Sequence, residues 1–273
     1  MSTSYWLPSK MNKSTPTSTA LNIINEQHII VPEDIRDLDT LVGLASCYNV
    51  HVRCRKLSNC SARISMLEDR GVITYDDETY YEPRIKFSIA HELGHFFLHR
   101  LNPHEVYEDT DADFRQKGRR SNREAEADEF ASELLMPTPL FIESIKMSGL
   151  MDPDFNLARY LASDFNVSLT AASMQLVSCR IYCCALVVAK DGQVCWFHAD
   201  PKFKYRSQLF DVVRNQVPPN SYISDYYENG ITDFQADEID AVCWFPDTNI
   251  SEKLFEHSLP IPANNRSLTL LWY

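Results

Sequence analysis

The chain has no long hydrophobic run, no excess of positive charge and no export signal. None of its 273 residues belongs to an apolar stretch of the roughly 18 residues that a membrane-spanning helix needs. Its 26 lysines and arginines stand against 38 aspartates and glutamates, and the net charge of −12 argues against non-specific binding to nucleic acid or anionic membranes. The first 20 residues also lack the apolar core of a signal peptide. We therefore expect a cytoplasmic protein without membrane contacts or direct nucleic-acid binding.

The eight cysteines lack the spacing of a cysteine-based metal site. Cys54 and Cys60 are six residues apart, and Cys183 directly precedes Cys184, so neither pair has the C-x-x-C spacing of a zinc knuckle. Without an export signal, cysteines in a chain of this length are expected to be reduced thiols and not a disulfide framework.

Composition and hydrophobic periodicity divide the chain into four expected parts. Residues 1–20 are rich in Ser, Thr, Lys and Pro and are typical of a flexible tail. Residues 21–145 combine amphipathic helices with a hairpin predicted from "ARISML" and "GVITYD". Residues 146–180 are predicted to be a helical connector. Residues 181–273 are predicted to be rich in strands, with a hairpin in "ALVVAKDGQVCWFH" and short strands in "AVCWF", "KLFEHSL" and "SLTLLWY". The expected fold class is α+β.

The segment "IKFSIAHELGHFFLHR", residues 85–100, contains the pattern H-E-x-x-H. On a helix, His91 and His95 lie one turn apart on the same face, so both imidazoles can bind one metal ion. Glu92 projects from the flank, where it can act on a water molecule without binding the metal itself. Gly94 has no side chain and would let another element approach the helix closely.

The alternative interpretation is a core helix with hydrogen-bonded histidines. A chain of this length and composition contains H-E-x-x-H by chance in roughly one or two per cent of cases, so the motif alone does not decide. The apolar residues around the motif form a neighbouring stripe that would be buried in either interpretation. Those residues are Phe87, Ala90, Phe97, Leu98 and Leu101. We interpret His99, a turn beyond His95, as structural.

A catalytic zinc site of this kind needs a third protein ligand, and the predicted helix 122–136 offers five acidic residues. At 100° per residue, Glu124 and Asp128 lie on or beside the apolar stripe of that helix, where an uncompensated charge is costly. We therefore predict Glu124 as the third ligand and Asp128 as the carboxylate that holds a ligand imidazole. The alternative is an inward carboxylate paired with a buried arginine. The other three acids are predicted to form a solvated face: Glu126, Glu129 and Glu133.

Together, "IKFSIAHELGHFFLH" and "EAEADEFASELLMP" resemble the ImmA/IrrE family of metallo-endopeptidases. Members of that family combine a HELGH helix with an E-x-E-A-N-x-F-A-x-x-L-L-M-P stretch. The resemblance covers about residues 21–137 and is weaker further on. Asp128 stands where the family has asparagine, but E-x-x-x-D is also the pattern of thermolysin-like zinc peptidases.

This resemblance implies a minimal zinc peptidase domain of the thermolysin-like, gluzincin type. It also implies a connector that resembles a helix-turn-helix and a C-terminal domain that senses a signal. Relatives cleave a DNA-binding repressor, so the implied partner is a helix-turn-helix repressor whose loss induces stress-response or mobile-element genes.

The ligand set implies a mechanism in which Zn²⁺ polarises the scissile carbonyl and Glu92 transfers protons. We expect the substrate to lie extended along "GVITYD", as an added strand at a sheet edge. The candidates for stabilising the oxyanion are His104, Tyr75 and Tyr107. The basic stretch "RQKGRRSNR" is interpreted as a solvated loop, with a docking patch for an acidic partner as the alternative.

Two other functions compete with the peptidase hypothesis. The stretch "LARYLASDFNVSLTAASMQLV" resembles a helix-turn-helix, which would suit a transcription regulator, but its second helix has no Lys or Arg to neutralise phosphates. The third hypothesis is a metal-binding sensor without proteolytic activity. The presence of Glu92 argues against it, since such a protein has no need of the base.

Overall fold

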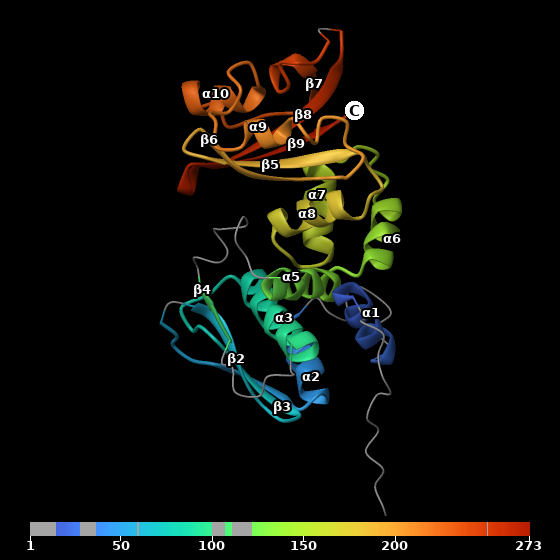
Figure 1. Cartoon of the computed structure of the whole chain (residues 1–273), viewed down its shortest axis with the longest axis vertical. Coiled ribbons are helices and arrows are strands. Elements are labelled where there is room, and N and C mark those ends of the chain that lie inside the picture. Colours follow the sequence, from blue (N-terminus) through green and yellow to red (C-terminus); the bar gives the residue numbers. More distant parts are fainter. Residues whose placement is uncertain (1–14, 28–36, 59, 100–106, 111–121, 250) are drawn as a thin grey trace, which may run out of the picture. The chain divides into compact units, whose positions relative to one another are not determined.

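The computed structural model shows an α+β protein, as the sequence predicted (Figure 1). It describes residues 15–27, 37–58, 60–99, 107–110, 122–249 and 251–273. None of the helices in these residues has both the length and the apolar composition needed to cross a bilayer. All eight cysteines lie within the described residues and are free thiols.

The chain divides between Pro137 and Thr138 into two compact units. The second unit joins the helical segment and the strand-rich segment that the sequence analysis treated as separate parts. The division into four parts stays a prediction.

The first unit contains a four-stranded sheet with the strand order β1-β3-β2-β4. Strands β2 and β3 form the predicted antiparallel hairpin, with Leu67 opposite Arg70. Gly71 lies beyond the two-residue turn, and a Cβ there would meet Ile64 and Phe96 at 3.3 Å. This glycine therefore serves the packing of the sheet against a helix. The strands are β1 (Val50–Cys54), β2 (Cys60–Leu67), β3 (Arg70–Tyr75) and β4 (Tyr107–Thr110).

The predicted substrate position along "GVITYD" is wrong, because β3 is an interior strand. It pairs in parallel with β1 on one side and antiparallel with β2 on the other, so its backbone groups are already used. In the described part of this sheet, β1 and β4 are the strands at an edge where an extended peptide could add.

Four helices accompany this sheet in the described part of the first unit: α1 (Pro16–Glu26), α2 (Leu38–Cys47), α3 (Glu82–His99) and α5 (Asn122–Leu135). Helix α3 packs on β2 and β3 and against α5, while α1 packs on α5 and also contacts α3. The prediction of a flexible tail up to residue 20 is wrong for residues 16–20, which belong to α1. Thr15 caps this helix by accepting a hydrogen bond from the backbone N–H of Ser18. Residues 1–14 lie outside the described residues.

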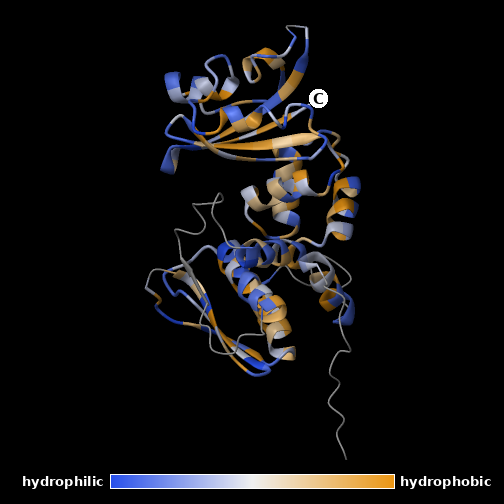
Figure 2. Cartoon of the chain, viewed as in Figure 1, coloured by the Kyte–Doolittle hydropathy of each residue, from blue (hydrophilic) through white to orange (hydrophobic). Residues whose placement is uncertain are grey.

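The second unit begins with three helices and continues into a sheet with the strand order β6-β5-β9-β8-β7. Helices α7 and α8 pack against each other, and α8 also packs on β5 and β6. Strand β5 is hydrophobic and buried along nearly its whole length (Figure 2). The elements are α6 (Thr138–Ser148), α7 (Phe155–Asp164), α8 (Leu169–Ser178), β5 (Cys184–Lys190), β6 (Gln193–Ala199), α9 (Leu209–Val212), α10 (Tyr222–Asn229), β7 (Asp237–Asp240), β8 (Lys253–Ile261) and β9 (Arg266–Trp272).

The hairpin β5–β6 and the strands β8 and β9 confirm three of the four strand predictions in this unit. The strand predicted for "AVCWF" is wrong. Ala241–Cys243 form a short 3-10 helix, because the backbone N–H of Trp244 donates to the carbonyl of Ala241. Trp244 and Phe245 are only 1% and 0% exposed, so this apolar run fills the core without entering the sheet.

Glu256 is a fully buried carboxylate in this core. Its oxygens accept hydrogen bonds from the backbone N–H of Ile223 (3.0 Å), from Nε1 of Trp244 (2.7 Å) and from Oγ of Ser258 (2.8 Å). Burial raises the pKa of Glu256 above its ordinary value, and these donors oppose that rise. Ile223 lies in the first turn of α10, where Ser221 makes no side-chain cap. Glu256 therefore caps α10 from the neighbouring strand.

We expect Glu256→Leu to destabilise the protein by on the order of 3–5 kcal/mol, because three buried donors lose their acceptor. Chemical unfolding measures this loss. The matched control is Glu228→Leu at an exposed position of α10, which should change the free energy of unfolding by less than about 0.5 kcal/mol. Equal stability of the two variants would contradict the capping role.

Candidate metal centre

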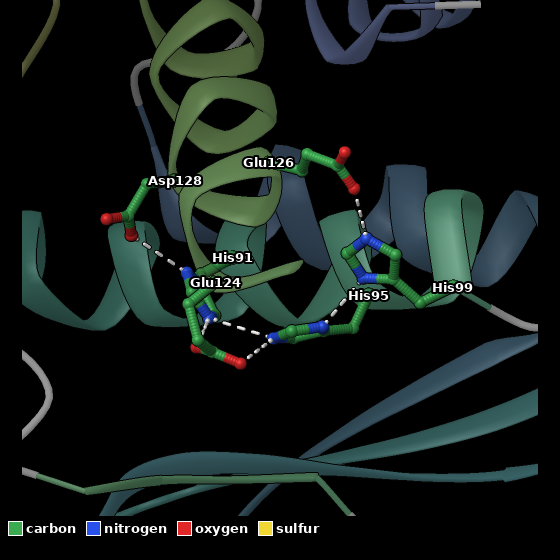
Figure 3. A network of polar contacts seen from close by, with 6 residues as sticks. All are labelled: His91, His95, His99, Glu124, Glu126 and Asp128. Carbon is green, nitrogen blue, oxygen red and sulfur yellow. Dashed lines mark hydrogen bonds and ion pairs between the residues drawn. The ribbon is translucent and has the colours of Figure 1, made fainter. Parts of the chain in front are cut away.

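Helices α3 and α5 bring the predicted site residues together. His91, Glu92 and His95 lie on α3 and are 1%, 1% and 2% exposed. Glu124 and Asp128 lie one turn apart on α5, and each side chain is about one quarter exposed. The two helices pack against each other, so two segments of the sequence bring four of these side chains into contact: His91, His95, Glu124 and Asp128. Figure 3 draws these four residues together with His99 and Glu126 and marks the contacts among the six.

The imidazoles of His91 and His95 and the carboxylate of Glu124 converge on one point. The Nε2 atoms of the two histidines are 3.0 Å apart. Oε2 of Glu124 lies 3.1 Å from Nε2 of His91, and Oε1 lies 3.3 Å from Nε2 of His95. In the described part of the chain, these three residues form the group of His, Cys, Asp and Glu side chains that could hold a metal ion.

Asp128 lies where the sequence analysis expected it, beside a histidine. Its Oδ1 is 3.0 Å from Nδ1 of His91. A carboxylate only accepts hydrogen bonds, so with a metal ion in place of the Glu124 contact at Nε2, Asp128 would hold the proton of a neutral His91 on Nδ1. The Nε2 lone pair of His91 then points to the convergence point, as metal binding requires.

A second set of contacts was missed by the sequence analysis. His99 was interpreted as structural and Glu126 as part of a solvated face. In the structure, Nδ1 of His99 is 2.9 Å from Nδ1 of His95, and Nε2 of His99 is 2.9 Å from Oε2 of Glu126. A signal was present in the sequence, since His99 follows His95 by four residues and shares its side of α3.

The solvated face predicted for α5 is partly wrong. Glu126 and Glu129 are exposed, but Glu133 is buried. Helix α1 packs on this side of α5, and Oγ1 of Thr17 donates to Oε1 of Glu129 at 2.7 Å. Helix α1, whose first residues were predicted to belong to a flexible tail, therefore helps to cover this face of α5.

The charges at the convergence point favour the protonation states that bind metals. Burial alone would raise the pKa of Glu124, but the hydrogen bonds with His91 and His95 hold it well below its ordinary value. Burial lowers the pKa of His95, which favours the neutral imidazole. A carboxylate and neutral imidazoles are the forms in which these side chains bind metal ions.

The three convergent residues fit a zinc ion in both chemistry and size. Two imidazole nitrogens and one carboxylate oxygen are a ligand set found in catalytic zinc sites, which keep a fourth position open. With bonds of 2.0–2.1 Å, tetrahedral ligand atoms lie about 3.3–3.4 Å apart. The separations of 3.0, 3.1 and 3.3 Å observed here need only small side-chain adjustments to match.

The remaining residues named in the sequence analysis are not among the three convergent residues or lie outside the described structure. Both carboxylate oxygens of Glu92 are buried. Tyr75 is at the end of β3 and half-buried. His104, the side chain of Tyr107 and the basic stretch before helix α5 lie outside the described residues. The oxyanion candidates therefore stay predictions.

Gly94 explains how α5 comes so close to α3. A Cβ on Gly94 would lie 3.0 Å from the Cα of Ala127, 3.1 Å from its carbonyl oxygen and 3.2 Å from Phe130. The sequence analysis expected a close approach at this glycine, and the structure identifies α5 as the approaching element. Because α5 carries Glu124 and Asp128, this contact sets the distance between the two halves of the site.

We expect Gly94→Ala to destabilise the protein by about 1–3 kcal/mol, because the backbone of α5 must move to admit the methyl group. The control is Gly43→Ala in α2, where a Cβ would meet nothing within 4 Å. That change should stabilise by roughly 0.5–1 kcal/mol through helix propensity. Urea unfolding compares the two, and a gain in stability at both positions would contradict the close packing.

A histidine pair and a carboxylate on two packed helices define a candidate metal centre of the metallopeptidase class. Residues 45–177 match the sequence profile of the IrrE N-terminal-like domain, which belongs to a family of metallopeptidases. The matched region contains all the convergent residues. Over this region the chain therefore belongs to the ImmA/IrrE family, and that family implies a metal cofactor.

Solved structures extend the likeness in fold beyond this domain. A Mycobacterium tuberculosis transcriptional regulator superposes with a TM-score of 0.60 and 13% sequence identity. The match covers 94% of this chain and 76% of the other. At this identity the likeness shows the fold alone. No curated protein matches the chain.

Proposed function

We propose that the first unit is a zinc-dependent endopeptidase of the thermolysin-like, gluzincin type. The observation that carries this proposal is the convergence of His91, His95 and Glu124 at separations that suit one tetrahedral ion. Membership of a metallopeptidase family supports it. The choice of zinc rests on the donor set of two imidazoles and one carboxylate.

Each residue of the site has a role in this proposal. His91, His95 and Glu124 would hold the ion, which supplies a Lewis acid that polarises the scissile carbonyl and makes water more acidic. Glu92 accepts the proton of the attacking water and passes it to the leaving amine. Asp128 fixes the proton of His91 on Nδ1 and so directs Nε2 toward the ion.

Glu92 lies on the helix that carries His91 and His95. Its side chain is 1% exposed, so the surrounding protein shields it from bulk water. It follows His91 directly in the chain, so its backbone is fixed by the helix that carries two ligands.

We propose a helix-turn-helix repressor as the substrate and the second unit as the part that senses a signal. Both proposals rest on the ImmA/IrrE membership and on the presence of a separate compact unit with its own core. Cleavage of such a repressor would induce stress-response or mobile-element genes. A DNA-bound substrate and eight free thiols both suit a cytoplasmic location.

The regulator hypothesis finds little support in the helices that suggested it. In α8, which would be the recognition helix, Ser178 is the only exposed residue. The helix packs on α7, β5 and β6 and contains no lysine or arginine. A recognition helix must place side chains in a groove and neutralise phosphates. We therefore propose α7 and α8 as a helical connector with a helix-turn-helix-like order.

Metal analysis of the purified chain tests the proposed site first. After dialysis against zinc and removal of the excess, elemental analysis should find about one zinc ion per chain. Co-expression with a small helix-turn-helix protein encoded next to this chain tests the substrate class, and that protein should be shortened. A chain that retains no zinc would overturn the proposed function.

A further inference from the structure

We propose that His99 and Glu126 are positioning residues that fix the orientation and the proton of His95. The inference rests on the metal centre of the proposed function and adds two residues to it. Asp128 has this role for His91 through one direct contact. Glu126 contacts His99, and His99 in turn contacts His95.

The geometry is a continuous chain of contacts from α5 back to α3 (Figure 3). Oε2 of Glu126 is 2.9 Å from Nε2 of His99. The other ring nitrogen of His99 is 2.9 Å from Nδ1 of His95. Nε2 of His95 then lies at the convergence point, 3.3 Å from Oε1 of Glu124. Each ring in the chain uses both of its nitrogens.

The acceptor at one end determines where the protons lie. The carboxylate of Glu126 can only accept, so Nε2 of His99 carries a proton and donates it. In a neutral imidazole the second nitrogen is then an acceptor, so Nδ1 of His99 accepts from Nδ1–H of His95. This arrangement directs the Nε2 lone pair of His95 to the metal position. The opposite proton arrangement would place a proton on Nε2 and block the ligand.

His99 should matter more than Glu126 for metal binding, because its side chain is the more buried of the two. His99 is 7% exposed, and its ring also packs 5.1 Å from that of His95, so no water can readily take its place. The side chain of Glu126 is 48% exposed, so water can replace the carboxylate as the acceptor. Loss of His99 should therefore cost more metal affinity than loss of Glu126.

The test is the zinc affinity of purified variants, measured by competition with a chromophoric chelator. His99→Leu keeps the bulk and removes the acceptor, and we expect its affinity to fall about 10–100-fold. His99→Asn places an amide oxygen near the position of Nδ1, so it should recover most of that loss. Glu126→Ala should lose at most about tenfold, and Glu129→Ala on the same helix should bind as the parent does.

Rescue by asparagine separates positioning from simple packing. If His99→Leu binds zinc as tightly as the parent, or if His99→Asn loses as much as His99→Leu, the inference is overturned. Thermal unfolding of the metal-free variants shows whether a loss of affinity merely reflects a loss of fold. A parent chain that binds no zinc would overturn the proposed function, whereas a parent that binds and a leucine variant that binds equally would overturn this inference alone.

Long-range proton–nitrogen correlation spectra of the zinc-loaded chain give a second readout that does not depend on activity. We expect a proton on Nδ1 of His95 and on Nε2 of His99, with Nδ1 of His99 unprotonated. In Glu126→Ala the pattern at His95 should persist. A proton on Nδ1 of His99, donated toward His95, would contradict the proposed arrangement.

Discussion

Glu92→Gln should bind zinc as tightly as the parent while its rate of peptide-bond cleavage falls by about two to four orders of magnitude. Glutamine keeps the shape of the side chain but cannot accept the proton of the attacking water. Since Glu92 is not among the three convergent residues, the metal ligands are unchanged. Zinc affinity and the initial rate of repressor cleavage, measured on the same preparation, separate the two effects.

The matched control is Glu129→Gln, an exposed glutamate on the partner helix, which should leave both quantities unchanged. If Glu92→Gln lost zinc together with activity, the carboxylate would be needed for zinc binding, and its role as the base would not be supported. If the zinc-loaded parent never cleaves, the alternative of a metal-binding sensor without proteolytic activity takes its place.

Glu124→Ala should lower the zinc affinity by more than about 100-fold, because a bound ligand contributes more than the outer contacts that cost 10–100-fold when lost. The substitution also leaves two imidazole nitrogens 3.0 Å apart with no anion beside them. Isothermal titration with zinc measures the change, and thermal unfolding of the metal-free protein shows that the fold is retained.

Glu129→Ala again serves as the control, since it removes the same charge from the same helix away from the convergence point. The assignment of the third ligand would be wrong if Glu124→Ala kept parental affinity. It would also be wrong if Glu126→Ala were the variant that abolished binding, because Glu126 contacts the site only through His99.

The ligands could be predicted because helix geometry is local. His91 and His95 share a face through their spacing alone, and the apolar stripe of α5 turns Glu124 and Asp128 inward. Burial of an uncompensated carboxylate is costly, so the inward pair indicated a cation from the sequence alone. The positions of these four residues therefore followed from two independent helical patterns.

The outer contacts could not be predicted, because they depend on how α3 and α5 approach each other. The place of Glu126 beside His99 follows from the close contact at Gly94, which is a property of the helix pair. In the same way, Glu133 is buried because α1 covers α5, and α1 begins in a segment whose composition is typical of a tail.

The errors in the strands have a non-local cause too. The parallel pairing of β1 with β3 places β3 inside the sheet, and no pattern within "GVITYD" encodes that neighbour. The run "AVCWF" has the apolar character of a strand, but its two aromatic residues fill the core from a 3-10 turn. Hydrophobic periodicity predicts whether a residue is buried more reliably than it predicts the secondary structure to which that residue belongs.

The most direct test of the account is mass spectrometry of a purified helix-turn-helix repressor, encoded beside this chain, after incubation with the zinc-loaded protein. We expect two fragments whose masses add up to the intact repressor plus one water. Cleavage should stop when a chelator removes the metal and resume when zinc is restored. An intact repressor in the presence of the zinc-loaded chain, or cleavage that continues unchanged in Glu92→Gln, would contradict the account.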